Sequence, residues 1–227
     1  MATQPKPGTS KSKASPPPGR VPLRKFRRNP LFRGDFNSDM NAAVGDNGGP
    51  YDFGAYSQGF FEGGFAVIAS AREGSVPLDI LVYPIAFSFR HGMELYIKYL
   101  LVELKLHNTS VAEYKRDHKL ESNWRAFVKA AEASGFDEFQ PEQIAQAGVI
   151  VSQFCEIDPN GQMFRYPEDI KGNRHLTDVA LINVDVLERG MRRLHSIFED
   201  WHLELYERRG AREVADAEAR AKTESED

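Results

Sequence analysis

The sequence predicts an all-α protein, an up-and-down bundle of about five helices that follows a disordered N-terminal arm. Apolar residues recur at helical spacing through most of the chain after residue 52, and residues 78–106 are apolar nearly all round. The alternation of apolar and polar residues that is typical of a strand is weak and confined to residues 175–183. It favours at most one short extended segment there. Helices with apolar faces and short connections bury those faces most simply in a bundle.

The N-terminal arm is strongly basic. Residues 1–34 contain nine Lys or Arg and no Asp or Glu, and they are rich in Pro, Ser and Gly. Such a segment buries too little apolar surface to offset its chain entropy, so we expect residues 1–50 to be a disordered basic arm and loop. The formal net charge is −4, so the arm's nine positive charges leave −13 on residues 35–227. The arm is therefore the part suited to an acidic partner, to nucleic acid or to a membrane surface, unless it only aids solubility.

The sequence contains no secretory or membrane-spanning signal. The arm lacks an apolar stretch, and no run of 18 apolar residues occurs. The single cysteine, Cys155, excludes an internal disulfide and lies in an apolar segment, where a core role is more common than a nucleophilic one. We therefore expect a cytoplasmic protein that makes no membrane contact through a spanning helix.

The first two predicted helices cover residues 52–73 and 78–106. The apolar stripe of the first is interrupted by Gly59, Gly63 and Gly64, which weaken the helix but allow close packing against a neighbour. The second is apolar on all sides and is expected at the centre of the bundle. Pro84 lies in its early part, so we expect either a start in that turn or a kink.

Three further helices are predicted. The third begins near Glu121 and ends at Ser134-Gly135, and the fourth begins with Pro141. The last runs from about Val184 to Arg208, and the bundle is therefore placed at residues 51–208. Residues 209–227 form a charged, Ala-rich tail, which we expect to prolong this helix before it frays. The residues expected to form the buried stripe of the last helix are Val186 or Leu187, Met191, Leu194, Phe198, Trp201 and Leu205.

A cluster of charges interrupts the apolar second helix. Arg90, Glu94 and Lys98 step by four residues and share one helix face, and His91 lies beside that face. Buried charges are tolerated only when they are paired, so Glu94 is expected to hold Arg90 or Lys98. The remaining cation then needs another partner or a ligand. The cluster is either a polar binding pocket, to which Arg165 adds a further cation, or a structural ion-pair network.

One segment of the chain resembles a known family. The string YPIAFSFRHGMELYIKYLL (Tyr83–Leu101), followed by His118-Lys119-Leu120 and Trp124, resembles the HEPN superfamily. The flanking strings AYSQGFFEGGFAVI and EIDPNGQMFRYPED are similar to a bacterial, uncharacterised branch of HEPN-like proteins, so the resemblance covers about Ala55 to Trp201. It implies a helical bundle that often dimerises and that, in many members, is a metal-independent endoribonuclease or toxin of a defence or toxin–antitoxin system.

The resemblance also implies a catalytic pair. Active members carry an Arg and a His a few residues apart in the last long helix, and Arg189 and His195 match this pattern with five residues between them. An Arg can stabilise a phosphorane while a His moves the proton of a 2′-hydroxyl. A solvated helix face is the alternative interpretation of this Arg-rich segment.

Two functions remain open at this point. The first is an HEPN-like endoribonuclease or RNA-binding component of a bacterial defence or toxin-like system, forming a homodimer and served by a protein partner encoded nearby. The second is a non-enzymatic helical module for interaction or ligand sensing. Neither requires a cofactor or a metal ion, since the sequence contains no phosphate-binding glycine loop and no metal-ligand spacing.

Overall fold

The computed structural model confirms the all-α fold. It describes residues 29–45, 51–74, 76–108 and 110–226, and the chain divides into two compact units, Met1–Gly49 and Pro50–Asp227. The described part of the first unit contains one short 3-10 helix, η2 (Ser38–Met40), and most of its residues are exposed. The predicted arm lies largely outside the described residues.

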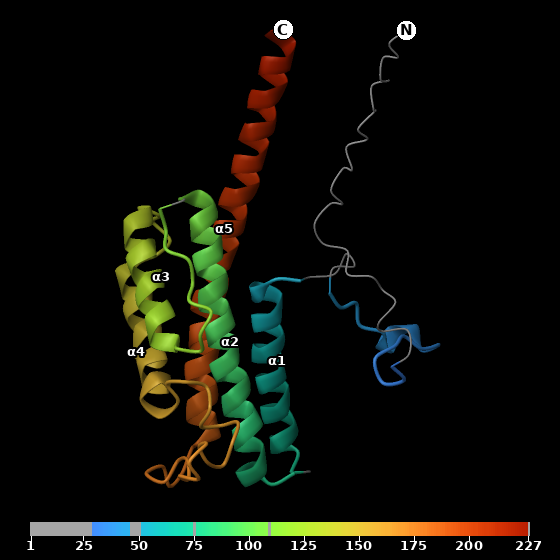
Figure 1. Ribbon diagram of the computed structural model, residues 1–227, viewed down its shortest axis with the longest axis vertical. Helices are drawn as coiled ribbons and strands as arrows, with labels where there is room; N and C mark the ends of the chain where they lie inside the picture. The colour runs from blue at the N-terminus through green and yellow to red at the C-terminus, as the bar shows by residue number, and fades with distance from the viewer. Residues whose placement is uncertain (1–28, 46–50, 75, 109, 227) are drawn as a thin grey trace, which may run out of the picture. The chain divides into compact units, whose positions relative to one another are not determined.

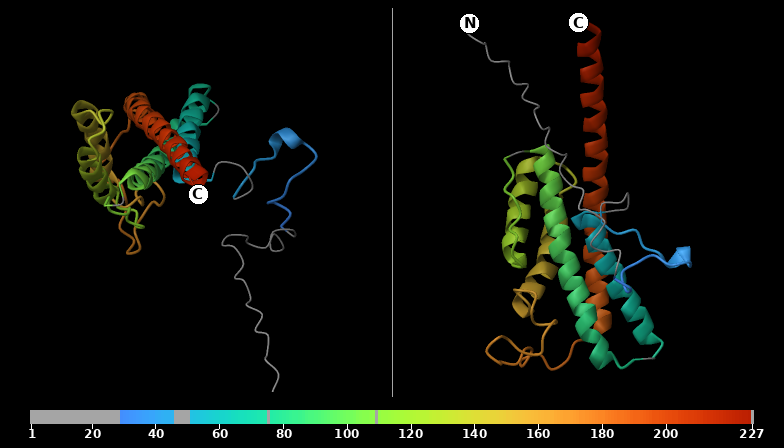
Figure 2. Two further views of the ribbon diagram at one scale, coloured as in Figure 1. Left: turned by 90° about the horizontal axis from the view of Figure 1, so that it is seen from above. Right: turned by 45° about the vertical axis from the view of Figure 1, so that its right-hand side comes forward.

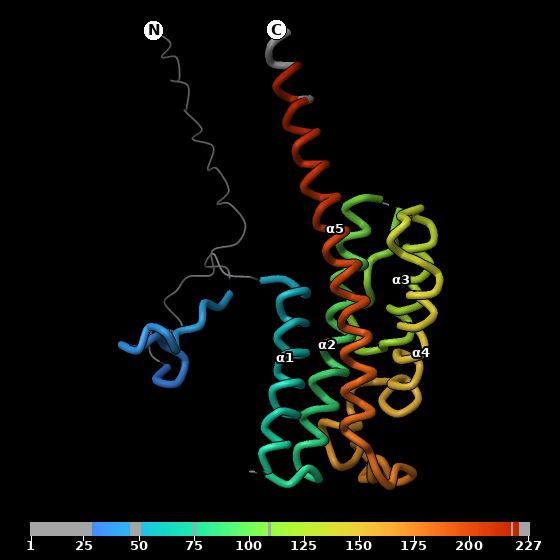
Figure 3. Tube along the Cα trace, turned by 180° about the vertical axis from the view of Figure 1, so that it is seen from behind, coloured from blue at the N-terminus to red at the C-terminus, as the bar shows by residue number. Residues whose placement is uncertain are grey.

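The described part of the second unit contains five α-helices, as predicted. They are α1 (Phe53–Arg72), α2 (Leu78–His107), α3 (Leu120–Ser134), α4 (Pro141–Ile157) and α5 (Val184–Glu226). Figure 1 and the view from behind in Figure 3 show α2 and α5 in the middle, with α1 on one side and α3 and α4 on the other. Residues 175–183 form no strand; between α4 and α5 the described chain has one isolated bridge, Glu168–Arg174. The expected extended piece is therefore absent from this segment.

The helix boundaries follow local chemistry. The Asp52 carboxylate caps α1 by accepting a hydrogen bond from the Ala55 amide (2.8 Å). Gly135, at φ 67°, ends α3 in the left-handed conformation that favours glycine. Pro141 is the first residue of α4, as predicted. Helix α2 begins six residues before Pro84 and continues through it, so the expected start of the helix in the turn of Pro84 is wrong.

Helices α1 and α2 approach each other closely. A Cβ on Gly64 would lie 2.7 Å from the ring of Phe89, and one on Gly92 would lie 3.0 Å from the ring of Phe61. The Ser57 hydroxyl also donates to the Gly92 carbonyl (2.7 Å). The expected close packing thus depends on Gly64, whereas Gly59 and Gly63 face open space.

The core lies between α2 and the surrounding helices. The predicted stripe of α5 is confirmed, since Met191, Leu194, Phe198, Trp201 and Leu205 are all fully buried. At the start of α5, Leu187 is partly buried and Val186 is exposed.

Helix α5 does not end near Arg208. It continues to Glu226, so the predicted charged tail is part of one long helix, and its last turns extend past the ends of the other four (Figure 1; Figure 2, right). None of the helices in the described part of the chain is both long and apolar enough to cross a membrane.

Candidate functional site

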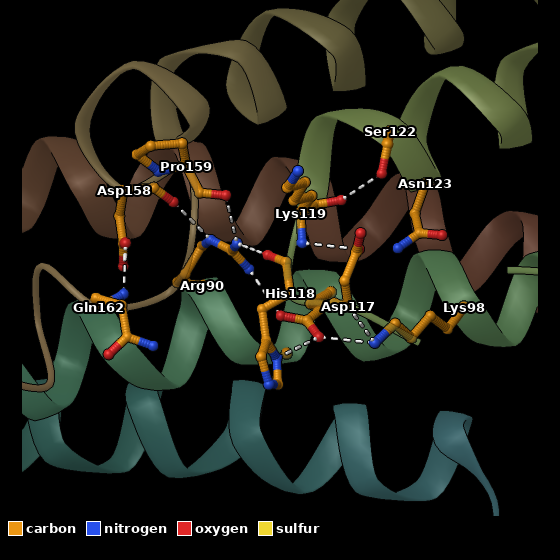
Figure 4. A network of polar contacts seen from close by, with 12 residues as sticks. Arg90, Lys98, Asp117, His118, Lys119, Ser122, Asn123, Asp158, Pro159 and Gln162 are labelled. Atoms are coloured by element: carbon orange, nitrogen blue, oxygen red, sulfur yellow. Dashed lines mark hydrogen bonds and ion pairs between the residues drawn. The ribbon is translucent and has the colours of Figure 1, made fainter. Parts of the chain in front are cut away.

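The charged stripe of α2 is buried, and its carboxylate binds both cations. Only 1% of Arg90, 2% of Glu94 and 6% of Lys98 is exposed. Arg90 Nη1 lies 3.1 Å from Glu94 Oε2, and Lys98 Nζ lies 2.8 Å from Glu94 Oε1. His118, from the loop before α3, also contacts Glu94 Oε1 through Nδ1 at 3.0 Å. Arg90, Glu94, Lys98 and His118 are called the Glu94 network below; Figure 4 labels Arg90, Lys98 and His118.

Further donors of both cations bind backbone carbonyls of two loops. Arg90 donates to the carbonyl oxygens of Asp158 (3.0 Å), His118 (2.7 Å) and Pro159 (3.4 Å), so its guanidinium lies between the loop before α3 and the loop after α4 (Figure 4). Lys98 donates to the Asp117 carbonyl (3.0 Å). The predicted leftover cation therefore has partners within the chain.

The loop after α4 is shaped to present these carbonyls. One carboxylate oxygen of Asp158 accepts hydrogen bonds from the amides of Gln162 (2.7 Å) and Met163 (3.2 Å). This turn closes the segment DPNG and holds the carbonyls of Asp158 and Pro159 toward Arg90 (Figure 4). The other carboxylate oxygen of Asp158 is buried and has no hydrogen-bond partner in the described part of the chain.

The electrostatics favour an ionised Glu94. Burial on its own raises the pKa of this carboxyl group, but the hydrogen bond and charge of Lys98, the charge of Arg90 and the hydrogen bond of His118 outweigh burial. The net effect is a pKa below the usual value for glutamate. The stripe is therefore a compensated ion network rather than a set of neutralised groups.

Among the described contacts, neither His91 nor Arg165 forms a hydrogen bond or ion pair with the Glu94 network, although the charges of the network act on His91. The His91 ring stacks on Phe87 (centroids 5.7 Å apart) and meets the edge of Phe60 (4.5 Å). Burial lowers the pKa of His91, so the uncharged ring is favoured. Arg165 is exposed and its guanidinium lies over the rings of Phe87 (5.7 Å) and Tyr166 (5.2 Å). The described contacts thus place these two predicted pocket residues around Phe87, not around Glu94.

The predicted catalytic pair occupies two different faces of α5. Arg189 is exposed, whereas the His195 side chain is only 17% exposed and its ring lies 4.7 Å from that of Phe61. His195 Nε2 lies 3.6 Å from a Glu199 carboxylate oxygen and has no hydrogen-bond partner among the described residues. Six residues along an α-helix correspond to about 120° around its circumference. One copy of α5 therefore does not bring the two side chains together.

Further polar contacts join α2 to α5, and sequence patterns gave no sign of them. The Tyr96 hydroxyl donates to the Phe198 carbonyl (2.8 Å), the Tyr99 hydroxyl contacts His202 Nδ1 (2.7 Å), and Arg209 pairs with the buried Glu103 (3.1 Å). Cys155 is partly buried, and burial raises the pKa of its thiol, as expected of a packing residue. Within the residues that the structure describes, no three His, Cys, Asp or Glu side chains form a metal site.

The described surface of the bundle includes two open hollows that lie away from the candidate residues. One, of about 370 Å³, lies between the end of α1 and the starts of α2 and α5. The other, of about 410 Å³, lies between α5 and the segment that leads into α4, and it contains several carboxylates. Its acidic side chains are Asp137, Glu138, Asp200, Glu204 and Glu207.

Comparisons with models of protein families, with curated proteins and with solved structures found no match to this chain.

Proposed function

We propose that this protein is a non-enzymatic helical interaction module. The observation that carries the proposal is the closure of the Glu94 network, in which each buried cation meets the carboxylate and at least one backbone carbonyl. A binding pocket needs polar groups that remain available to a ligand, and these groups are already bound within the chain. The network is better suited to fix two loops on a rigid bundle.

The basic arm is the part of this module best suited to an extended anionic partner such as RNA. Nine positive charges without a negative one contrast with the acidic remainder of the chain. Binding of this kind is non-specific and falls steeply with salt, because it is driven by release of counterions from the nucleic acid. The arm would supply the contact, and the bundle would supply the folded platform.

A charge-neutralising variant tests the contact in the full chain. Replacing Arg24, Lys25, Arg27 and Arg28 together with Gln removes four charges and changes no residue of the bundle. We expect weaker binding to a labelled single-stranded RNA, and a slope of log K against log salt that is smaller by about three. Equal salt slopes for the variant and the wild type would contradict the proposed role of the arm.

An HEPN-like, metal-independent endoribonuclease is the second candidate, favoured by the spacing of Arg189 and His195 on one helix. It is tested by incubating RNA with the purified chain in EDTA, with Arg189→Ala and His195→Ala alongside. The interaction module predicts intact RNA in all three samples. Cleavage by the wild type that is lost in both variants would establish the nuclease instead.

A further inference from the structure

The end of α5 carries a regular stripe of apolar and small residues. Their spacing along the chain is three, four, four, three and four residues, so the pattern repeats after eleven. The stripe consists of Leu203, Tyr206, Gly210, Val214, Ala217 and Ala221. An eleven-residue repeat corresponds to about 3.67 residues per turn, close to that of a straight α-helix, so the stripe stays on one side of it. At about 100° per residue, the six positions fall within about 80° of the helix circumference.

This stripe lies on the side of α5 that faces away from the core. Leu203 and Tyr206 are 58% and 56% exposed, and from Gly210 to Lys222 every residue whose burial is described is exposed, Val214 (60%) included. The core-facing positions Trp201 and Leu205, in contrast, are fully buried. Helix propensity accounts for the alanines of this segment but not for Val214 or Tyr206, which are less favourable in a solvated helix.

The stripe complements itself when two copies run in opposite directions. A twofold axis near residue 212 places Leu203 against Ala221 of the second copy and Tyr206 against its Ala217. The same axis places Gly210 against Val214 of the second copy. Every layer then pairs a larger side chain with a smaller one, which is the condition for even packing across a helix pair.

A parallel pair would pack less well. Tyr206 would meet Tyr206 of the second copy beside a layer in which two Gly210 residues meet. The line of the stripe also continues toward the bundle through Glu199 and Arg192, which in a parallel pair would each face their own charge. The antiparallel arrangement avoids both conflicts.

We propose that residues 203–221 of α5 bind the same segment of a second copy as an antiparallel helix pair. The exposed area of the stripe gives a contact on the order of 900 Å² in total, below the ~1,200–2,000 Å² of standard interfaces. Contacts of this size are typical of weak, transient assemblies, so we expect a reversible dimer. The proposed pairing rests on residues of α5 alone, so it stands independently of the proposed RNA contact.

The first test measures the molar mass of the full chain by sedimentation equilibrium between about 1 and 300 µM, a range that covers weak, reversible assemblies. We expect a rise from 25.6 kDa toward twice that value. Val214→Glu should raise the dissociation constant at least tenfold, whereas Ala215→Glu, one residue further and away from the stripe, should leave it within about twofold. A constant mass of 25.6 kDa, or equal effects of the two variants, would overturn the proposal.

The second test establishes the direction of the helices. Leu203→Cys and Ala221→Cys chains are prepared in a Cys155→Ser background, mixed and oxidised gently. The antiparallel pair predicts a disulfide between the two different chains. A preference for Leu203→Cys chains to crosslink with each other would overturn the antiparallel arrangement, and circular dichroism confirms that each variant remains helical.

Discussion

Replacing Glu94 with alanine removes the carboxylate of the Glu94 network and leaves Arg90 and Lys98 buried without a counter-ion among the described residues. Removal of one partner from a buried pair costs about 3–5 kcal/mol. Both cations retain backbone carbonyl partners, which places the cost at the lower end of this range. We therefore expect a loss of about 3 kcal/mol in the free energy of unfolding, or a fall in Tm of about 6–12 °C for a domain of this size.

Urea unfolding at pH 7, followed by circular dichroism, measures this loss. Glu113→Ala is the matched control, because Glu113 pairs with Lys105 at 2.7 Å but its side chain is 77% exposed. Exposed pairs contribute little, so the control should stay within about 0.5 kcal/mol of the wild type. Equal midpoints for Glu94→Ala and Glu113→Ala would show that the network is solvated and that our account of α2 is wrong.

The same network predicts a pH dependence with a definite sign. The pKa of Glu94 is lower in the folded chain than the ordinary value of 4.5. Its contribution is therefore fully present above pH 4.5 and is lost as the pH falls through the folded-state pKa. The stability difference between the wild type and Glu94→Ala should accordingly shrink below pH 4.5, in the same unfolding assay.

Three further predictions concern neighbouring elements. Burial lowers the pKa of His91 from 6.5, so the folded protein loses stability when the pH falls below 6.5 and this ring becomes protonated. His91→Phe should therefore flatten the dependence of Tm on pH below 6.5, and an unchanged slope would contradict this. Gly64→Ala should destabilise the fold by about 1–3 kcal/mol through its clash with Phe89, whereas Gly63→Ala, which faces open space, should be neutral or stabilising by up to about 1 kcal/mol in the same urea assay. Arg192→Ala should lower Tm more than Arg189→Ala, because Arg192 pairs with Glu188 at 2.8 Å and lies over the ring of Phe65; the opposite order in a thermal melt would refute this ranking.

The buried charges were predictable because their pattern is local. Side chains four residues apart share a helix face, and charged side chains on a buried apolar helix are shielded from solvent and must pair. The pairing of Glu94 with its neighbours on α2 therefore followed from the sequence. The carbonyl partners of Arg90 and Lys98 were not predictable. A backbone carbonyl exists at every residue, and only the tertiary fold selects those of Asp117, His118 and Asp158.

The surroundings of Arg189 and His195, in contrast, were not predictable from their spacing. A spacing along one helix fixes an angle around its axis but not what covers each side, and α1 packs the Phe61 ring against His195 while Arg189 stays exposed. The length of α5 was also underestimated. Its end is charged and Ala-rich, and such a composition suits both a frayed tail and a solvated helix, so composition alone did not distinguish them.

Arg90 links two loops that are distant in sequence, because its guanidinium binds both of them. Its guanidinium binds the carbonyls of His118, before α3, and of Asp158 and Pro159, after α4. Neither loop can move away from α2 without releasing bonds to the same side chain, so their openings are coupled although they are far apart in sequence. Amide hydrogens of both loops should therefore exchange with solvent deuterons at matched rates, as one cooperative unit, and loss of the guanidinium would let each loop open on its own timescale.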